Sequence, residues 1–410
     1  MDVETVIFGG GAAGLWLLDE LLRRGRPALL LENQALGSGQ TVGSQGILHG
    51  GLKYTLSGLL TGSAAAIREM PAVWRDCLAG RREPRLTRTR LRAEFCYLWR
   101  TSSVSSRLGM IGARFGLRVA PRMLDPEERP AVLQHCPGTV ARLDEQVIAP
   151  DTFVAELAAR HGGHILRAVD LALALDGPGR VRAVALQNPE TREGLTLVPR
   201  QVVFTAGSGN AELRRRAGLS SAAMQRRPLH MVLARGRLPV LNGHCVDGSG
   251  TRVTITSDRD ATGRTVWQIG GQIAEEGVTA DERQLLSRAR EELTAAIPGL
   301  ALGDVEWSTY RVDRAERATA GGTRPDTPQI LCEGNVLTAW PTKLAFVPRL
   351  AEELVRRIAS SGPPVANRHV PLTPDDWPRP PVARPPWEAI ATWWRLADDG
   401  RPFEVERVAA

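Results

Sequence analysis

Three glycines and one acidic residue near the start of the chain have the spacing of a dinucleotide site. Gly9, Gly11 and Gly14 follow an apolar segment and open a segment with helical periodicity, and a second apolar segment ends at Glu32. The first glycine allows a tight turn, the second lets a pyrophosphate approach the helix N-terminus, and the third lets helix and strand pack closely. Glu32 would bind an adenosine ribose and repel a 2′-phosphate. The pattern predicts FAD or NAD rather than NADP.

Lysine is rare in this chain, and the two lysines stand in unusual surroundings. Of the 52 basic residues only Lys53 and Lys343 are lysines, and the other 50 (52 − 2) are arginines. Both lie among apolar residues with glycine or proline close by. An ammonium is a compact charge that can titrate, whereas a guanidinium is broad and always charged. We therefore expect both lysines at a functional site; the alternative is two surface lysines.

Two histidines and three arginines are further candidates for chemistry. An imidazole titrates near neutral pH and can accept a proton, so His49 and His230 are candidate general bases, with His230 favoured. Arg311, Arg314 and Arg324 are candidates for holding a carboxylate or phosphate through paired hydrogen bonds. The alternative for each arginine is a place on the surface. The other histidines are expected in turns or helix ends, exposed to solvent: His135, His161, His164, His244 and His369.

The elements that must position these groups follow from the apolar periodicity. Strand and helix alternate up to about residue 60, and residues 64–92 are expected to be helical and Arg-rich. Helices are predicted over 152–161, 281–296 and 347–358, and a buried strand over 202–205 ends in a second Gly-rich turn. Segments 230–234, 253–256 and 266–269 alternate with period 2 and predict an antiparallel sheet. The predicted fold class is α/β, and α+β overall, with a Rossmann-like domain and an inserted antiparallel-sheet substrate domain.

Composition limits the other possibilities. At 410 residues and 43% hydrophobic content the chain is long enough for two or three cores. It has no run of 18 apolar residues and starts its first strand within three residues, so we expect a cytoplasmic protein. The five cysteines are scattered without a CxxC motif, so we expect buried thiols, no disulfide framework and no metal site. The charge of +7 favours anionic small molecules, nucleic acid or acidic lipid headgroups in principle, but the arginines are spread along the whole chain, so we expect a solvated surface with local anion sites. No aromatic-interleaved basic motif points to nucleic acid.

Several motifs together carry a family resemblance. They are the glycine fingerprint, the turn Thr205-Ala-Gly-Ser-Gly209, the stretch Gln45-Gly-Ile-Leu-His49-Gly-Gly-Leu-Lys53-Tyr54, the strand at His230 and the turn at Lys343-Leu344. The chain resembles FAD-dependent oxidoreductases of the D-amino-acid oxidase superfamily, and within it flavin-dependent glycerol-3-phosphate dehydrogenases and 2-hydroxyglutarate oxidases. It departs from them where Pro341-Thr342 replaces two glycines and Lys53 replaces an arginine, and it lacks their long C-terminal helical domain.

The resemblance implies FAD as the cofactor and a discontinuous flavin domain. The implied FAD-binding domain comprises residues 1–70, 141–225 and 325–360, the substrate domain 71–140 and 226–324, and residues 361–410 form a Pro-rich tail with a terminal helix. The implied FAD contacts are Gly9, Gly11, Ala12, Ala13, Gly14, Glu32, Asn33, Thr41, Ser44, Gln45, Gly46, Leu48, Gly50, Val147, Thr205, Ala206, Gly207, Thr342, Lys343 and Leu344. The implied catalytic and substrate-binding set is His230, Lys343, His49, Lys53, Tyr54, Arg311, Arg314 and Arg324.

The favoured function is an FAD-dependent dehydrogenase or oxidase of a small anionic hydroxy compound, of the 2-hydroxy-acid or glycerol 3-phosphate type. Such a reaction needs a base for the hydroxyl proton, hydride delivery to flavin N5 and a cation near the flavin pyrimidine, a role that suits Lys343. The stretch Gly322-Thr-Arg324-Pro-Asp-Thr-Pro328 resembles amine oxidases of the same superfamily, which keeps an amine or amino-acid oxidase open. A non-catalytic or RNA-modifying flavoprotein is the weaker alternative. The electron acceptor, oxygen or quinone, is left open, and nothing indicates membrane association.

Overall fold

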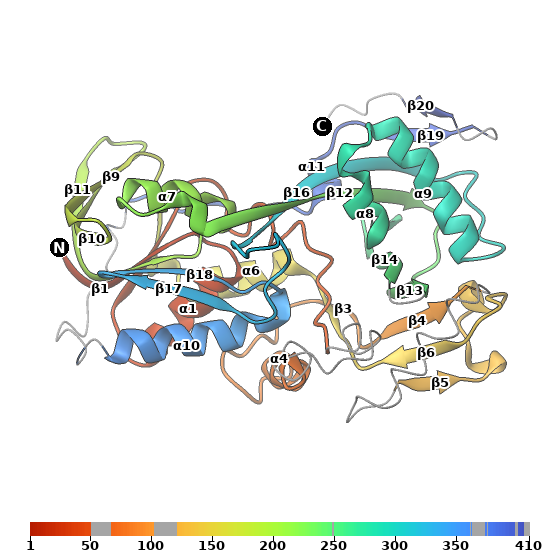
Figure 1. Cartoon of the computed structure of the whole chain (residues 1–410), viewed down its shortest axis with the longest axis horizontal. Helices are drawn as coiled ribbons and strands as arrows, with labels where there is room; N and C mark the ends of the chain where they lie inside the picture. The colour runs from red at the N-terminus through yellow and green to blue at the C-terminus, as the bar shows by residue number, and fades with distance from the viewer. Residues whose placement is uncertain are drawn as a thin grey trace.

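The computed structural model describes residues 1–50, 67–101, 121–247, 250–360, 362, 374, 376–397 and 401–405. These residues form two lobes, each built around its own large sheet (Figure 1). One sheet is mainly parallel with helices against it, and the other is mainly antiparallel. The predicted α/β fold with a Rossmann-like part and an antiparallel sheet is confirmed.

The first sheet has eight strands. Its main path runs β17-β18-β11-β1-β2-β8, and the β9–β10 hairpin extends from β11. The five strands from β18 to β8 are parallel, as expected for a dinucleotide-binding sheet. The strands are β1 (Asp2–Phe8), β2 (Ala28–Glu32), β8 (Ile165–Arg167), β9 (Leu171–Gly177), β10 (Arg180–Gln187), β11 (Gly194–Phe204), β17 (Gln329–Glu333) and β18 (Val336–Trp340).

Four helices share the core on one face of this sheet. They are α1 (Ala12–Arg23), α4 (Met70–Leu78), α6 (Pro150–Arg160) and α10 (Val347–Ser360). Trp16 of α1 packs between Trp74 of α4 and Phe153 of α6, with ring centres 4.8 and 6.1 Å away. A second apolar cluster lies on the other face and includes Val184 of the β9–β10 hairpin. Because both faces are covered, the central strands are buried throughout, which explains their continuous apolar sequences.

The second sheet has ten strands in the order β20-β19-β16-β12-β15-β14-β13-β4-β6-β5. Helices α8 (Gln272–Glu276) and α9 (Glu282–Ala296) pack on one face, and Asp281 caps α9 by accepting a bond from the Gln284 amide. The strands are β4 (Cys96–Arg100), β5 (Arg122–Leu124), β6 (Val140–Leu143), β12 (Met224–Gly236), β13 (Gly243–Asp247), β14 (Gly250–Arg259), β15 (Thr265–Gly270), β16 (Glu306–Arg317), β19 (Trp394–Leu396) and β20 (Pro402–Glu404). A small separate sheet pairs β3 (Leu91–Ala93) with β7 (Val147–Ile148).

A long ribbon joins the two lobes. Strands β12 and β16 pair over twelve positions, from Met224 opposite Arg317 to Arg235 opposite Glu306. Figure 1 shows this ribbon passing from the first lobe into the second sheet. The predicted domain boundary at residue 141 falls within β6, a strand of the second sheet, while β7 and α6 follow directly.

The predicted terminal helix is wrong. Only α11 (Pro386–Ala389) is helical there, and residues 394–396 form β19, which pairs with β16 on one side and β20 on the other. Trp307 of β16 pairs with Trp394, and the apolar side chains of the segment pack against the sheet instead of forming a helix face. Aromatic residues favour a pleated, half-buried surface, so tertiary pairing decides the structure of this short segment.

The predicted helix over residues 64–92 and the predicted burial of the cysteines are each only partly confirmed. Residues 64–92 are not one helix: α4 ends before Gly80, which has a φ of +71°, and β3 begins at Leu91. All five cysteines are free thiols, and four are buried as expected, whereas Cys332 is exposed. Among the described helices, none is long and apolar enough to cross a bilayer.

Candidate active site

A pocket of about 680 Å³ opens at the carboxyl ends of the parallel strands. Its walls come from the loops that follow β1, β2, β11 and β18, from residues 38–44, and from the middle of β16. Open parallel sheets bind ligands at this edge, and the volume lies in the usual range for small-molecule and cofactor sites. The pocket thus brings together segments that are more than 300 residues apart in the chain.

The glycine turn after β1 is shaped by close backbone contacts. Gly9 has a φ of +105°, and a Cβ there would lie 2.5 Å from Ala206 Cα. A Cβ on Gly14 would lie 2.0 Å from the Gly9 carbonyl oxygen, so only glycine lets α1 approach β1 this closely. At Gly11 the sole close neighbour of a Cβ would be Thr41 Oγ1, at 3.1 Å. The Ala12 amide at the start of α1 donates to the same Thr41 hydroxyl at 3.1 Å, and Gly11, Ala12 and Ala13 line the pocket, so this helix N-terminus faces the pocket and is suited to phosphate groups.

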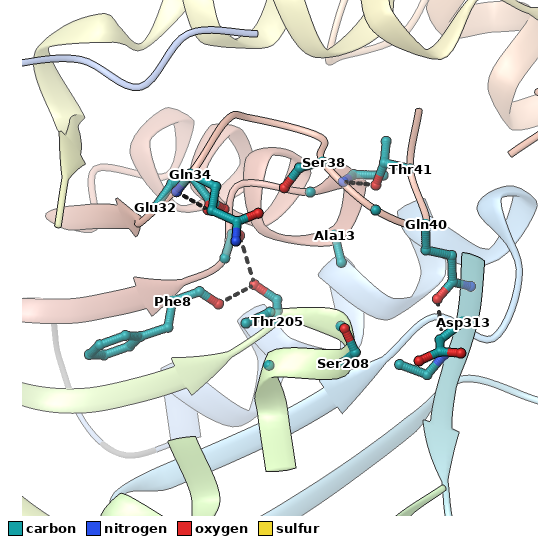
Figure 2. Close-up of a pocket in the computed structure, with 18 of the residues that line it drawn as sticks. Phe8, Ala13, Glu32, Gln34, Ser38, Gln40, Thr41, Thr205, Ser208 and Asp313 are labelled. Carbon is teal, nitrogen blue, oxygen red and sulfur yellow. Dashed lines mark hydrogen bonds between the residues drawn. The ribbon is translucent and has the colours of Figure 1, made fainter. Parts of the chain in front are cut away.

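Glu32 is held rigidly at the pocket edge (Figure 2). Its Oε2 accepts a hydrogen bond from the Gly10 amide at 2.7 Å, and its Oε1 accepts one from the Gln34 amide at 2.9 Å. The Thr205 hydroxyl lies nearby and bonds the carbonyl oxygens of Phe8 and Gly9. Each carboxylate oxygen of Glu32 keeps a lone pair for another donor, as ribose binding requires.

Thirteen of the predicted FAD contacts line the pocket. They are Gly9, Gly11, Ala12, Ala13, Glu32, Asn33, Thr41, Ser44, Thr205, Ala206, Gly207, Lys343 and Leu344. The other predicted contacts do not line it: Gly14, Gln45, Gly46, Leu48, Gly50, Val147 and Thr342. Gly46 has a φ of +73°, and its Cβ would lie 2.0 Å from the Ile148 carbonyl oxygen.

The pocket loop around Gly43 is fastened to the second sheet. The Tyr310 hydroxyl donates to the Gly43 carbonyl at 2.8 Å, and Gln45 Nε2 donates to the carbonyls of Thr254 and Gln268, each at 2.9 Å. Burial raises the pKa of the Tyr310 phenol, so it remains a donor at all physiological pH values. The sheet of the second lobe thus fixes the loop that forms a wall of the pocket.

A strained turn presents Lys343. Thr342 has a φ of +62°, and the Lys343 amide donates to the Pro341 carbonyl at 2.7 Å, which describes a γ-turn with positive φ. Such a turn is costly for a β-branched residue. The Lys343 side chain is only 7% exposed and lines the pocket, just before the short turn η7 (Leu344–Phe346) and α10. The Lys343 ammonium lies 5.2 Å from the centre of the Phe346 ring, at the start of this helical segment.

A buried carboxylate joins two histidines, His49 and His244; none of the three residues lines the pocket, but His49 lies five residues after Ser44, which does. Glu145 Oε2 lies 3.5 Å from His49 Nδ1 and 3.3 Å from His244 Nε2, and Glu145 Oε1 accepts the Gly50 amide at 2.7 Å. Burial alone would raise the pKa of Glu145, but the hydrogen bonds from His244 and His49 outweigh it and hold the pKa well below the ordinary value. Glu145 thus stays ionised. A histidine oriented by a buried carboxylate is an arrangement suited to a general base.

The structure does not bring His230 to the pocket. Its Nδ1 lies 3.1 Å from the Gly277 carbonyl in the turn η6 (Gly277–Thr279), and burial lowers its pKa, so the ring is neutral and donates to that carbonyl. Arg311 pairs with His230 in register and lines the pocket, but its guanidinium donates to the Val278 and Ala280 carbonyls of the same region. Strand alternation explains this placement, because successive side chains of a strand point to opposite faces of the sheet. Tyr310 points toward Gly43, so the side chains of Arg311 and of its partner His230 point to the other face.

The remaining candidates lie elsewhere. Arg314 bonds Glu275 at 2.7 Å. Arg324 lies between β16 and β17, away from the pocket wall. Lys53 and Tyr54 are outside the described residues.

Sequence reasoning missed Glu145 and His244, two of the three residues in the cluster that they form with His49. His244 was expected to be solvated, but it lies in β13 and is 3% exposed. Its place in an apolar, alternating segment before Cys245 was a signal for a buried strand. Glu145 gave no such signal, because it lies between the short strands β6 and β7 and meets His49 only through the fold.

Comparisons with known proteins agree with this architecture. The family model described as DAO, FAD dependent oxidoreductase, matches residues 4–336. A probable FAD-dependent oxidoreductase of Pseudomonas aeruginosa is 38% identical over 394 residues, which cover 95% of this chain and 98% of the relative. The crystal structure of that FAD-dependent oxidoreductase superposes with a TM-score of 0.79 at 35% identity, over 95% of this chain and 98% of the other.

More distant solved structures share the fold. Glycine oxidase from Geobacillus kaustophilus has a TM-score of 0.62 at 17% identity, covering 90% of this chain and 99% of its own. Glycerol-3-phosphate dehydrogenase from Bacillus halodurans, complexed with FAD, has a TM-score of 0.59 at 16% identity, covering 88% and 64%. At these identities the likeness concerns the fold.

Proposed function

Because the chain belongs to the DAO family of FAD-dependent oxidoreductases, we propose that the pocket holds FAD and that the enzyme oxidises a small anionic hydroxy compound. The residues present fit this cofactor. The α1 N-terminus at Gly11, which lines the pocket, suits the pyrophosphate, and the fixed carboxylate of Glu32 suits the adenosine ribose. The end of the pocket at Lys343 and Leu344 suits the flavin ring.

His49 is the proposed general base. When bound, FAD supplies the chemistry of hydride acceptance at flavin N5. Removing a hydride from an alcohol carbon also requires that the hydroxyl proton leave, and in this proposal His49, whose Nδ1 faces Glu145, accepts it. Glu145 fixes the tautomer and stabilises the imidazolium, and His244 holds the other side of the same carboxylate oxygen.

Lys343 is proposed to stabilise the reduced flavin. Its buried ammonium, together with the helical segment that starts at Leu344, would stabilise negative charge on the flavin pyrimidine. The same positive potential favours an anionic substrate over a neutral one.

The single observation that carries the choice of substrate class is the contact between His49 Nδ1 and the buried Glu145 carboxylate. An alcohol keeps its proton at neutral pH and needs a base, whereas a fraction of an amine is already unprotonated. A base held by a buried carboxylate therefore favours a hydroxy compound over an amine.

Substrate charge provides the test. Steady-state kinetics of a 2-hydroxy acid and of its neutral amide should differ by about 10 to 1,000-fold in kcat/KM, from roughly 1.5 to 4 kcal/mol of charge-assisted bonding. Raising the salt concentration should reduce the difference only slightly, since buried charges are poorly screened. Equal turnover of neutral alcohols or of amines would defeat the proposal, and turnover of amines would favour an amine oxidase.

A further inference from the structure

The C-terminal segment, residues 376–397, crosses from one lobe to the other past the pocket. On the first lobe, Trp377 Nε1 donates to the Arg167 carbonyl at 2.9 Å, and the Leu36 amide donates to the Pro381 carbonyl at 2.7 Å. On the second lobe, Ser308 Oγ donates to the Thr392 carbonyl at 2.8 Å, and β19 pairs with β16. Between these two anchors, Pro386 is one of the residues that line the pocket.

The next residue, Trp387, is buried against the pocket side of the second sheet. It is 3% exposed and belongs to an apolar cluster with Leu233, Val266 and Trp393, against which Tyr310 packs. These neighbours lie on the face of the sheet opposite to α8 and α9, because Val232 and Ala234 of β12 belong to the helix-covered core. The C-terminal segment therefore covers the face of the sheet opposite to α8 and α9.

Trp387 also contacts the end of a chain of polar groups. The guanidinium carbon of Arg92 lies 5.2 Å from the centre of the Trp387 ring. Arg92 Nη1 donates to Gln268 Oε1 at 3.2 Å, Gln268 Nε2 donates to the Tyr310 hydroxyl at 3.0 Å, and Tyr310 donates to the Gly43 carbonyl at 2.8 Å. Gly43 lines the pocket. The chain thus connects Trp387 to the pocket wall.

The Arg92 end of this chain carries positive charge. Asp258 is paired with Arg92 Nε at 2.7 Å and also with both terminal nitrogens of Arg90. Two guanidinium groups thus share one carboxylate, and the Arg92 side chain is 2% exposed. A buried cation on an aromatic face is attracted to the ring, which favours one position for the guanidinium.

We propose that Trp387 is a positioning residue for the flavin site: the C-terminal segment forms part of the pocket wall and, through Arg92, Gln268 and Tyr310, fixes the loop at Gly43. The inference rests on the proposed place of FAD in this pocket. It assigns the C-terminal segment a role in the flavin environment rather than in folding alone.

The test uses the full-length holoenzyme and sulfite, which adds to flavin N5 and bleaches the visible absorption. Trp387→Ala should weaken sulfite binding about tenfold and shift the visible flavin band, because Arg92 loses its aromatic contact and the Gly43 loop loosens. Trp387→Phe, which keeps an aromatic face, should restore most of the affinity. Tyr310→Phe removes a single oxygen and should give a similar shift even if Trp387→Ala does not fold.

Trp377→Ala is the matched control, because Trp377 is an equally buried tryptophan of the same segment on the first lobe. It should lower the thermal unfolding midpoint without changing sulfite affinity. The proposal is overturned if folded Trp387→Ala or Tyr310→Phe binds sulfite like the wild type, or if Trp377→Ala causes the same change. Failure of the FAD placement is distinguished by Gly11→Val: a variant that kept its flavin would show that the cofactor lies elsewhere.

Discussion

His49 Nδ1 lies 3.5 Å from Glu145 Oε2, although the two residues are 96 positions apart in the chain. Glu145 also accepts the amide of Gly50, so the loop that carries His49 is tied to the carboxylate twice. This relationship gives the proposed base its orientation and its charge partner.

Replacing Glu145 with glutamine should alter the pH profile of the enzyme. The imidazolium form of His49 loses the carboxylate that stabilises it, so the acid limb of kcat/KM should move to lower pH. The plateau rate should fall about 10 to 100-fold, because the base is weaker and less well oriented. Measurement of kcat/KM from pH 5 to 9 checks this. An acid limb at the same pH in wild type and variant would show that Glu145 has no role in catalysis.

The same carboxylate should make stability depend on pH. The folded-state pKa of Glu145 is depressed, so its ionisation stabilises the fold above the unfolded-state pKa, and this contribution is lost as the pH falls toward the folded-state pKa. The difference in unfolding free energy between wild type and Glu145→Gln should therefore shrink when the pH is lowered from 6 to 3. Urea titrations at several pH values measure it, and a difference that grows on acidification would contradict the burial and pairing described.

Lys343→Met should lower the reduction potential of the flavin while leaving FAD bound. Loss of one buried cation beside the pyrimidine, valued at roughly 1.4 kcal/mol, corresponds to about 30 mV for a two-electron couple. Dye-equilibration titrations of wild type and variant give the two potentials. Lys343→Arg is the conservative control and should lie between them; an unchanged potential in Lys343→Met would rule out the role.

Gly11→Val should give a folded protein without flavin. The added side chain would project into the space at the α1 N-terminus, where only Thr41 is near, and would exclude a pyrophosphate. Absorbance near 450 nm measures the bound flavin, and far-ultraviolet circular dichroism shows whether the variant is folded. Gly25→Ala is a control at a site with open space, although its φ of +68° imposes mild strain.

Sequence reasoning predicted many of the residues that line the pocket because local spacing encodes them. The requirement for glycine at positions 9 and 14 comes from contacts within one β-α-β unit and the adjoining turn at Ala206, and such units have a fixed geometry. Lys343 stood out because only two of the 52 basic residues are lysines and because the turn at Lys343-Leu344 resembles one in the family.

The positions of the candidate catalytic and substrate-binding residues were harder to predict, because strand pairing in the second sheet determines them. His230 and Arg311 occupy neighbouring strands, and strand alternation alone decides which face each one takes. The cluster of His49, Glu145 and His244 assembles from three segments with no fixed spacing. The predicted terminal helix is wrong because residues 394–396 pair with β16 as a strand, and the local sequence does not encode this pairing.

Anaerobic reduction of the bound flavin tests the central claim most directly. The holoenzyme is mixed without oxygen with 2-hydroxy acids, polyol phosphates and amino acids, and the flavin absorbance is followed for wild type and His49→Asn. Anionic hydroxy compounds should bleach the wild-type flavin, and His49→Asn, with FAD still bound, should bleach about 10² to 10⁴-fold more slowly, as expected for loss of a general base. Bleaching by amino acids alone, or an equal rate in His49→Asn, would contradict the account.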